Sequence, residues 1–247
     1  MVGRLEGRAV AFLPRHGQGH RFSPSEVPFR ANMFGFKLLG VEWIISVSAV
    51  GSLKGEYAPR HIVIPDQFFD RTKLRKDSFF GDGLVAHVSF AEPVSPVLSE
   101  VLHNCAKEAG ATVHNGGTYV NMEGPAFSTK AESLWHRACN FDVIGMTNLT
   151  EAKLAREAEI AYATMAMVTD YDCWHEEEEH VNVEMLIATL QANADTAQAI
   201  IRAAVKRIPR EPDPLCANAL ATAIITDRSK IPPATLEKLR PIVGKYF

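Results

Sequence analysis

The sequence has few of the features that mark secreted, membrane-spanning or nucleic-acid-binding proteins. Its four cysteines, Cys105, Cys139, Cys173 and Cys216, lie far apart and form no CxxC pair, which favours reduced thiols in a cytoplasmic setting over a disulfide framework. No apolar run approaches the length of a membrane span, and residues 1–8 are charged where the centre of a signal peptide is apolar. With 26 Lys and Arg against 29 Asp and Glu, there is no basic excess, so neither a membrane nor a nucleic-acid partner is expected.

The length and composition fit an ordinary globular domain. The 247 residues are enough to bury one large core, and 47% hydrophobic and 22% charged residues are usual proportions for such a protein. The chain contains no internal repeat and no low-complexity segment. We therefore expect a single domain over residues 1–247.

Short apolar runs alternate with helical patterns along the chain. Strands are predicted at residues 9–13, 42–47, 61–64, 86–90, 118–122, 143–146 and 161–168. Helices are predicted at residues 29–39, 96–109, 129–138, 151–158 and 184–208, with another after the Pro-rich stretch that follows residue 209. Thr129 and Glu132 have the spacing of a capping box. The alternation predicts an α/β fold, a single-domain three-layer sandwich with a mixed central β-sheet flanked by helices.

Ligands in such folds gather beyond the carboxyl ends of strands, and the segments there carry suitable side chains. Residues 15–20 (RHGQGH) follow the first predicted strand, and an Arg beside glycines can grip an anion. Residues 46–53 (SVSAVGSL) offer hydroxyl groups and backbone N–H groups to an anion as well. Taken singly, each segment is equally compatible with a polar surface turn.

A pair of carboxylates follows the last predicted strand. Asp170 and Asp172 lie one residue apart, and such a pair suits a 6-aminopurine: one carboxylate accepts from the exocyclic amine, and the other, when protonated, donates to N7. A solvated acidic turn is the alternative interpretation. Glu123 and Phe127 flank a Gly-Pro step and would face a sugar and a base, or else form a turn with Phe127 in the core. The acidic run at residues 175–180 indicates a solvated surface, and no metal site is expected.

Taken in order, these segments are more specific than any one of them. Residues 13–17, 48–53, 66–72, 122–128, 146–147 and 166–174 resemble the methylthioadenosine phosphorylase family of the purine nucleoside phosphorylases, from about the first strand to the end of the helix near residue 208. The resemblance implies a phosphorylase-like α/β fold and a homotrimer with active sites near the subunit contacts. It also implies phosphorolysis of S-methyl-5'-thioadenosine, in purine and methionine salvage, with inorganic phosphate as a substrate and no cofactor.

The resemblance also assigns roles to individual residues. The phosphate ligands would be Arg15, His16, Ser48, the backbone of Ala49, and Thr147. Asp170 would act catalytically at N7 and the amine, and Asp172 at the amine. Substrate contacts would come from Met146 under the ribose, Phe127 near the purine, His20 near the 5' end, His87 of a neighbouring subunit, and an apolar 5'-methylthio pocket made by Val181, Val183, Leu186 and Ile187.

Two features keep other functions open. Relatives that prefer 6-oxopurines carry Asn in the base pocket, so Asp170 and Asp172 favour adenine, but a broader purine nucleoside phosphorylase remains an alternative. Family members usually begin with an additional strand and a Gly-rich phosphate loop, and residues 1–247 contain no such segment. A catalytically impaired nucleoside-binding protein is therefore the second alternative.

Overall fold

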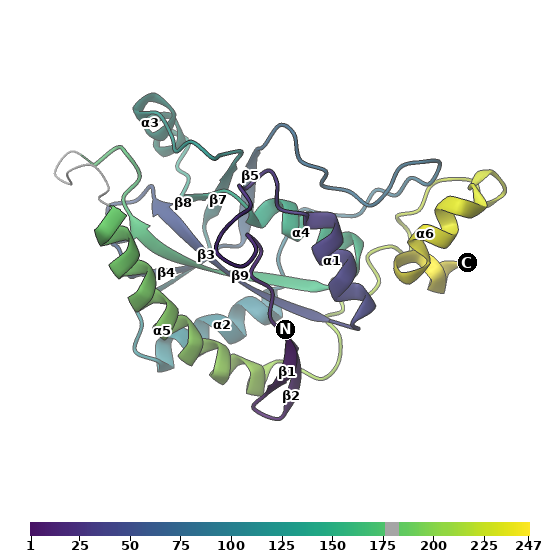
Figure 1. Ribbon diagram of the computed structural model, residues 1–247, viewed down its shortest axis with the longest axis horizontal. Coiled ribbons are helices and arrows are strands. Elements are labelled where there is room, and N and C mark those ends of the chain that lie inside the picture. Colours follow the sequence, from purple (N-terminus) through teal and green to yellow (C-terminus); the bar gives the residue numbers. More distant parts are fainter. Residues whose placement is uncertain (176–182) are drawn as a thin grey trace.

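A seven-stranded mixed sheet forms the centre of the protein (Figure 1). The computed structural model describes residues 1–175 and 183–247. The order of the strands across the sheet is β5 (Gln67–Arg71), β7 (Thr118–Met122), β8 (Val143–Gly145), β3 (Trp43–Ser52), β9 (Ala161–Asp170), β4 (Ile62–Ile64) and β6 (Val113–Asn115). Four neighbouring pairs are parallel, whereas β3 pairs with β8, and β4 with β9, in the antiparallel sense. The predicted mixed sheet is confirmed.

The parallel pair β3 and β9 forms the core of the sheet. Residues 161–169 of β9 are all buried, as expected for a strand covered on both faces, which appears in the sequence as a continuous apolar run. The register runs from Trp43 opposite Ala161 to Val50 opposite Val168, and an irregularity then sets Gly51 opposite Asp170. This register brings the carboxyl ends of β3 and β9, which are far apart in the sequence, side by side at one edge of the sheet.

Helices cover both faces of the sheet, which confirms the predicted layers. On one side lie α2 (Pro96–Glu108) and α5 (Val183–Arg207), which share an apolar cluster with β4 and β9. On the other side lie α1 (Phe29–Leu38) and α4 (Asn148–Glu157), whose cluster extends to α6 (Pro233–Val243). Two short 3₁₀ helices, η1 (Arg228–Lys230) and η2 (Gly244–Tyr246), flank α6.

The helix α3 (Lys130–Ala138) begins where its capping pattern predicts. The Thr129 side chain accepts from the backbone N–H of Glu132, and the Glu132 carboxylate accepts from the backbone of Thr129. Similarly, α2 begins at Pro96 with Ser95 as its cap. These local signals fix the starts of two helices independently of the tertiary structure.

The strands differ from the sequence predictions in three places. Residues 86–90 form no strand, because only one isolated bridge joins Ala86 to Ile224. The strands β5 and β6 were not predicted, since both are short and partly exposed and lack a marked apolar run. The predicted strand at 9–13 is present as β2 (Arg8–Ala11), which pairs with β1 (Val2–Leu5) in a separate antiparallel hairpin.

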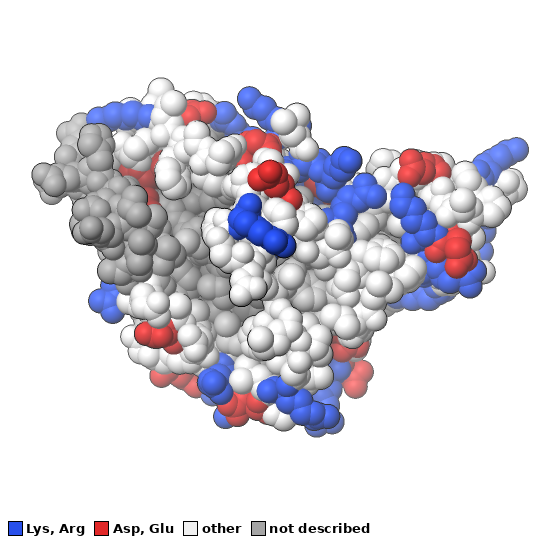
Figure 2. Space-filling model, in the orientation of Figure 1, with Lys and Arg blue, Asp and Glu red and all other residues white. Residues whose placement is uncertain are grey.

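The surface carries both signs of charge. On the face in Figure 2, Lys and Arg lie among Asp and Glu rather than forming one continuous basic surface. Within the described part of the chain, no helix is both long and apolar enough to cross a membrane. In the same part, no group of three or more His, Cys, Asp or Glu side chains is arranged to hold a metal ion.

Candidate active site

The predicted site residues come mainly from four places in the fold. Residues 15–20 form a loop after the hairpin, Ser48 and Ala49 lie in the second half of β3, Met146 and Thr147 lie between β8 and α4, and Asp170 ends β9. Thr147 is the N-cap of α4, and its side chain is 4% exposed. Since these positions lie at the ends of adjoining strands, the fold brings most of the predicted residues to one edge of the sheet.

The guanidinium of Arg15 is hydrogen-bonded to three residues of the protein. Its Nε donates to Oε1 of Glu151 at 2.5 Å, its Nη1 to the carbonyl oxygen of Val47 at 3.0 Å, and its Nη2 to Ser46 Oγ at 2.5 Å and Glu151 Oε2 at 3.1 Å. Burial opposes the charge on Arg15, but the attraction of Glu151 outweighs burial and raises the pKa of the guanidinium. Four of its five N–H groups are used in this way, so one Nη1 hydrogen remains beyond these contacts.

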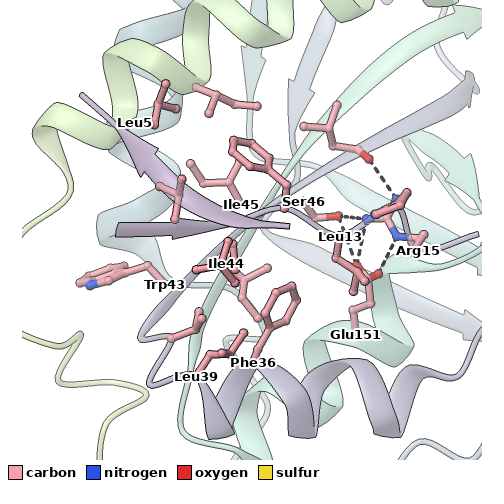
Figure 3. A pocket seen from close by; sticks show the side chains of 18 of the residues that line it. Leu5, Leu13, Arg15, Phe36, Leu39, Trp43, Ile44, Ile45, Ser46 and Glu151 are labelled. Atoms are coloured by element: carbon pink, nitrogen blue, oxygen red, sulfur yellow. Dashed lines mark hydrogen bonds and ion pairs between the residues drawn. The ribbon is translucent and has the colours of Figure 1, made fainter. Parts of the chain in front are cut away.

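Arg15 and Glu151 stand at one end of a cavity of about 720 Å³ (Figure 3). The rest of this cavity is bounded by the β1–β2 hairpin, α1, the first half of β3 and the end of α5. Its walls are mostly apolar, with Leu5, Phe36 and Ile45 among the side chains drawn. The cavity therefore joins a charged end, which includes His16 and His20, to an apolar interior.

The two histidines of this loop lie against each other. Their rings stack with centroids 4.2 Å apart and an interplanar angle of 6°. Nδ1 of His16 is 2.8 Å from the carbonyl oxygen of Phe22, which can only accept, so Nδ1 carries the proton in the neutral ring. Burial lowers the pKa of His16. A neutral His16 therefore presents Nε2 as a proton acceptor.

Asn148 connects the predicted residues of three segments. Its Oδ1 accepts from Thr147 Oγ1 at 3.1 Å and from the hydroxyl of Tyr119 at 3.3 Å, and its Nδ2 lies 3.3 Å from Ser46 Oγ. The Tyr119 hydroxyl is in turn 3.2 Å from Ser48 Oγ. Through these contacts, one buried amide fixes the hydroxyl groups of Ser48 and Thr147 and a partner of Arg15.

Asp170 and Asp172 both lie close to Gly51. A β-carbon added at Gly51 would lie 3.1 Å from Oδ1 of Asp170 and 3.4 Å from Cβ of Asp172. Thr169 Oγ1 donates to Oδ2 of Asp170 at 2.7 Å. Asp172 is 9% exposed, and its Oδ2 has no hydrogen-bond partner among the described residues. A solvated acidic turn would leave this carboxylate exposed, so that alternative interpretation is wrong for Asp172, whereas Asp170 is half-buried.

Other predicted residues have different surroundings. Phe127 is 75% exposed, so the alternative that places it in the core is wrong. Met146 packs against Gly124, where an added β-carbon would come within 2.6 Å of its Sδ. His87 belongs to another part of the surface, where its backbone N–H donates to the carbonyl oxygen of Ala223 at 2.9 Å.

The predicted methylthio pocket falls outside the described part of the structure. Val181 lies outside the described residues. Val183, Leu186 and Ile187 belong to the first turns of α5, and their side chains lie outside the described part of the structure.

Glu123 anchors a loop. Its carboxylate accepts from Ser25 Oγ, from Nε of Arg75 at 2.9 Å, and from the backbone N–H groups of Lys73 and Leu74 at 2.5 and 3.2 Å. Burial raises the pKa of Glu123, but these donors outweigh it and lower the pKa to about 2. Arg75 also donates to the carbonyl oxygen of Met146 at 3.1 Å. Glu123 therefore fixes the position of Arg75, which in turn binds the backbone of a predicted substrate contact.

Sequence reasoning missed the residues that hold the others in place. Glu151, Asn148, Tyr119 and Arg75 each have a hydrogen-bond partner that is distant in the sequence. Of these, only Asn148 had a local signal, because it opens a helix directly after a predicted ligand.

Comparisons with known proteins agree on one family. The family model described as "Phosphorylase superfamily" matches residues 1–206. The S-methyl-5'-thioadenosine phosphorylases of Koribacter versatilis and Geobacter sulfurreducens are each 58% identical over 247 residues, which is all of this chain and 85% and 86% of theirs.

Solved structures give the same result. A methylthioadenosine phosphorylase from an antarctic soil metagenomic library superposes with a TM-score of 0.93 at 49% identity, covering 98% of this chain and 85% of that one. Methylthioadenosine phosphorylase from Schistosoma mansoni in complex with adenine superposes with a TM-score of 0.85 at 34% identity, covering 90% of this chain and 87% of that one. With this identity and coverage, the chain belongs to the phosphorylase superfamily and, within it, to the S-methyl-5'-thioadenosine phosphorylases.

Proposed function

We propose that this chain catalyses the phosphorolysis of S-methyl-5'-thioadenosine to adenine and 5-methylthioribose 1-phosphate. The observation that carries the proposal is the position of Asp170 and Asp172 against Gly51, with one buried carboxylate oxygen of Asp172 unpartnered among the described residues. An acceptor of this kind suits the exocyclic amine of adenine, because leaving it unpaired in a buried site is costly. The relatives named above support the same substrate.

The phosphate ligands in this proposal are Arg15, His16, Ser48, the backbone of Ala49, and Thr147. Arg15 supplies the positive charge, and its contacts with Glu151 fix the direction of the remaining N–H group. Thr147 stands at the N-terminus of α4, where backbone N–H groups favour an anion. Asn148 fixes both hydroxyl groups in advance, which limits the reorganisation needed on binding.

The reaction then follows from the placement of charge. The bond between C1' and N9 breaks with its electron pair going to the purine, and a phosphate oxygen forms a new bond to C1'. Asp170, when protonated, donates to N7 of the leaving adenine, and Asp172 accepts from its amine. Arg15 donates to the phosphate beneath C1', and Nε2 of the neutral His16 accepts from its P–OH group. In this position the phosphate also stabilises the positive charge on the sugar. Phosphate is a substrate, and the proposed reaction needs no metal or organic cofactor.

For the nucleoside, we propose that Met146 packs under the ribose and Phe127 covers the purine. His20 and the four apolar residues at positions 181, 183, 186 and 187 would surround the 5'-methylthio group. The exposure of Phe127 supports a role as a movable cover or as a contact with another subunit.

We further propose that residues 1–247 act as one phosphorylase domain, in a homotrimer in which His87 of one subunit reaches the site of the next. Exposed apolar side chains on and near α3, including Leu134 and Trp135, support a subunit contact there. A cytoplasmic location and a role in purine and methionine salvage belong to the same proposal.

The experiment that tests the proposal compares substrates. Rates of phosphorolysis should be measured with S-methyl-5'-thioadenosine, adenosine and inosine under the same phosphate concentration. We expect the methylthio substrate to have the highest kcat/KM and inosine the lowest, because Asp172 can accept from an amine but not from a 6-oxo group. Comparable activity on inosine would favour the broader purine nucleoside phosphorylase. Binding of adenine without any turnover would favour an impaired nucleoside-binding protein.

A further inference from the structure

One face of α3 packs against the turn that follows Asp170. Ser133, His136 and Arg137 are three or four residues apart on this helix and so share a face. Two of them face the turn: the guanidinium of Arg137 lies 3.3 Å from the centroid of the Trp174 ring, and the charge of Asp172 acts on His136. These contacts place α3 beside the turn that contains Asp172.

His136 stands out on this face. It is 3% exposed, yet neither ring nitrogen has a hydrogen-bond partner among the described residues. Asp172, with which it interacts, has an unpartnered buried oxygen as well. Two unpartnered polar groups near each other in a protein interior are costly unless they meet directly, through a water molecule, or on a ligand.

The surroundings of His136 decide its charge. Burial lowers its pKa, and Arg71 of β5 acts in the same direction, whereas Asp172 of the turn and Glu132 of α3 act in the opposite direction. Burial is the strongest of these influences, so the imidazole is neutral at pH 7. A neutral imidazole has one N–H donor and one acceptor, and only the donor can serve a carboxylate.

We propose that His136 is a positioning residue of the purine site, whose N–H group binds the Asp172 carboxylate through one water molecule and keeps it aimed at the exocyclic amine. The proposal rests on the proposed function, because it takes Asp172 as the acceptor of that amine. Capping of α3 by Thr129 and Glu132 fixes the helix that carries the imidazole, so the donor is held in place before the substrate arrives.

The test uses two substitutions at His136 that separate hydrogen bonding from packing. His136→Gln keeps an N–H donor but loses the aromatic ring. His136→Phe keeps a ring for packing beside Trp135 and Phe141 but loses the donor. Adenine affinity is measured by calorimetry, and KM and kcat for S-methyl-5'-thioadenosine are measured beside it. A matched control is His103→Phe on α2, a helix that packs with α5 in a separate apolar cluster.

We expect His136→Phe to weaken adenine binding about tenfold and to raise KM more than it lowers kcat, which is the usual cost of one hydrogen bond to a charged group. His136→Gln should stay within about threefold of the wild type, and His103→Phe should change nothing. With Asp172→Ala already present, His136→Phe should have no further effect, because the two residues act as a unit.

Three results would overturn the proposal. The first is His136→Phe binding adenine as well as the wild type, and the second is His136→Gln being the weaker variant, since both would mean that the imidazole serves packing alone. The third is an effect of His136→Phe that persists unchanged beside Asp172→Ala. Because adenine binding requires no turnover, a wild type that binds adenine without phosphorolysis contradicts the proposed function but still tests His136. A wild type that binds no adenine contradicts both.

Discussion

Arg15 and Glu151 form an ion pair across 136 residues of sequence, with Nε of the arginine 2.5 Å from Oε1 of the glutamate. The side chains are 18% and 5% exposed, so the pair is largely removed from water. Tyr162 adds a hydrogen bond from its hydroxyl to Oε2 of Glu151 at 2.8 Å. The carboxylate therefore both neutralises the arginine and sets the direction in which it points.

We predict that Glu151→Gln destabilises the protein by about 3 kcal/mol or more, because it leaves a buried guanidinium without its counter-charge. The phosphate KM should rise as well, since Arg15 loses its fixed orientation. Urea denaturation and initial rates at varied phosphate concentration measure the two effects. The control is Glu237→Gln, whose partner Arg240 is exposed, and which should change stability by less than about 0.5 kcal/mol. Equal behaviour of the two variants would contradict the prediction.

A second prediction concerns Gly51, which has no room for a side chain. An alanine β-carbon there would lie 3.1 Å from Asp170 Oδ1 and 3.2 Å from Ile144 Cγ2, so the Asp170 carboxylate and the Ile144 side chain would have to move. We expect Gly51→Ala to fold but to lose about 10-fold to 100-fold in kcat/KM. Gly35→Ala in α1 is the control, because nothing lies within 4 Å of its β-carbon position, and helix propensity should make that variant slightly more stable. Full activity of Gly51→Ala would show that the aspartates are not confined as described.

A third prediction is a pH dependence of stability at Glu123. Its pKa is lowered from 4.5 to about 2 in the folded protein by four hydrogen-bond donors that outweigh burial. A lowered folded pKa stabilises the protein above the unfolded value, and this contribution is lost as the pH falls from about 5 toward 2. We expect Glu123→Gln to cost about 2–3 kcal/mol at pH 7.

Denaturation at pH 7, 5 and 3.5 measures the effect. The difference between the wild type and Glu123→Gln should narrow as the pH falls, while a control at the exposed Glu211 should show no such trend. A difference that is constant over this range would mean that the carboxylate charge contributes nothing.

A fourth prediction concerns the choice of base. Asp170→Asn can donate from its amide but cannot supply a carboxyl proton to N7, so kcat/KM for S-methyl-5'-thioadenosine should fall by about 10²–10³. The preference for 6-aminopurines over 6-oxopurines should also narrow. Parallel assays with inosine measure the ratio, and Asp195→Asn on the exposed side of α5 serves as the control. If the ratio of the rates with S-methyl-5'-thioadenosine and inosine stays unchanged, Asp170 does not contact the base.

The sequence predicted the parts of this structure that local signals determine. The apolar run of β9 and the capping box of α3 define their elements without reference to the rest of the chain. The placement of candidate residues at strand ends follows from the general rule for α/β sheets. The paired aspartates were recognised because they directly follow such a strand.

Other features depend on contacts between distant residues, and no local pattern could indicate them. Nothing in the sequence near Arg15 points to Glu151, and nothing near Ser48 points to Tyr119 or Asn148. The strands β5 and β6 form because they pair with β7 and β4, and their own composition does not favour a strand. The segment at residues 86–90 has the composition of a strand but finds only one bridging partner.

The most direct test of the account is the release of adenine from S-methyl-5'-thioadenosine by this chain, measured with and without inorganic phosphate. The account predicts release that requires phosphate and that yields one equivalent of 5-methylthioribose 1-phosphate for each adenine. Release at the same rate without phosphate would mean that water attacks C1', and no release at all would mean that Arg15, His16, Ser48 and Thr147 do not form a working phosphate site. Either result would contradict the proposed phosphorolysis.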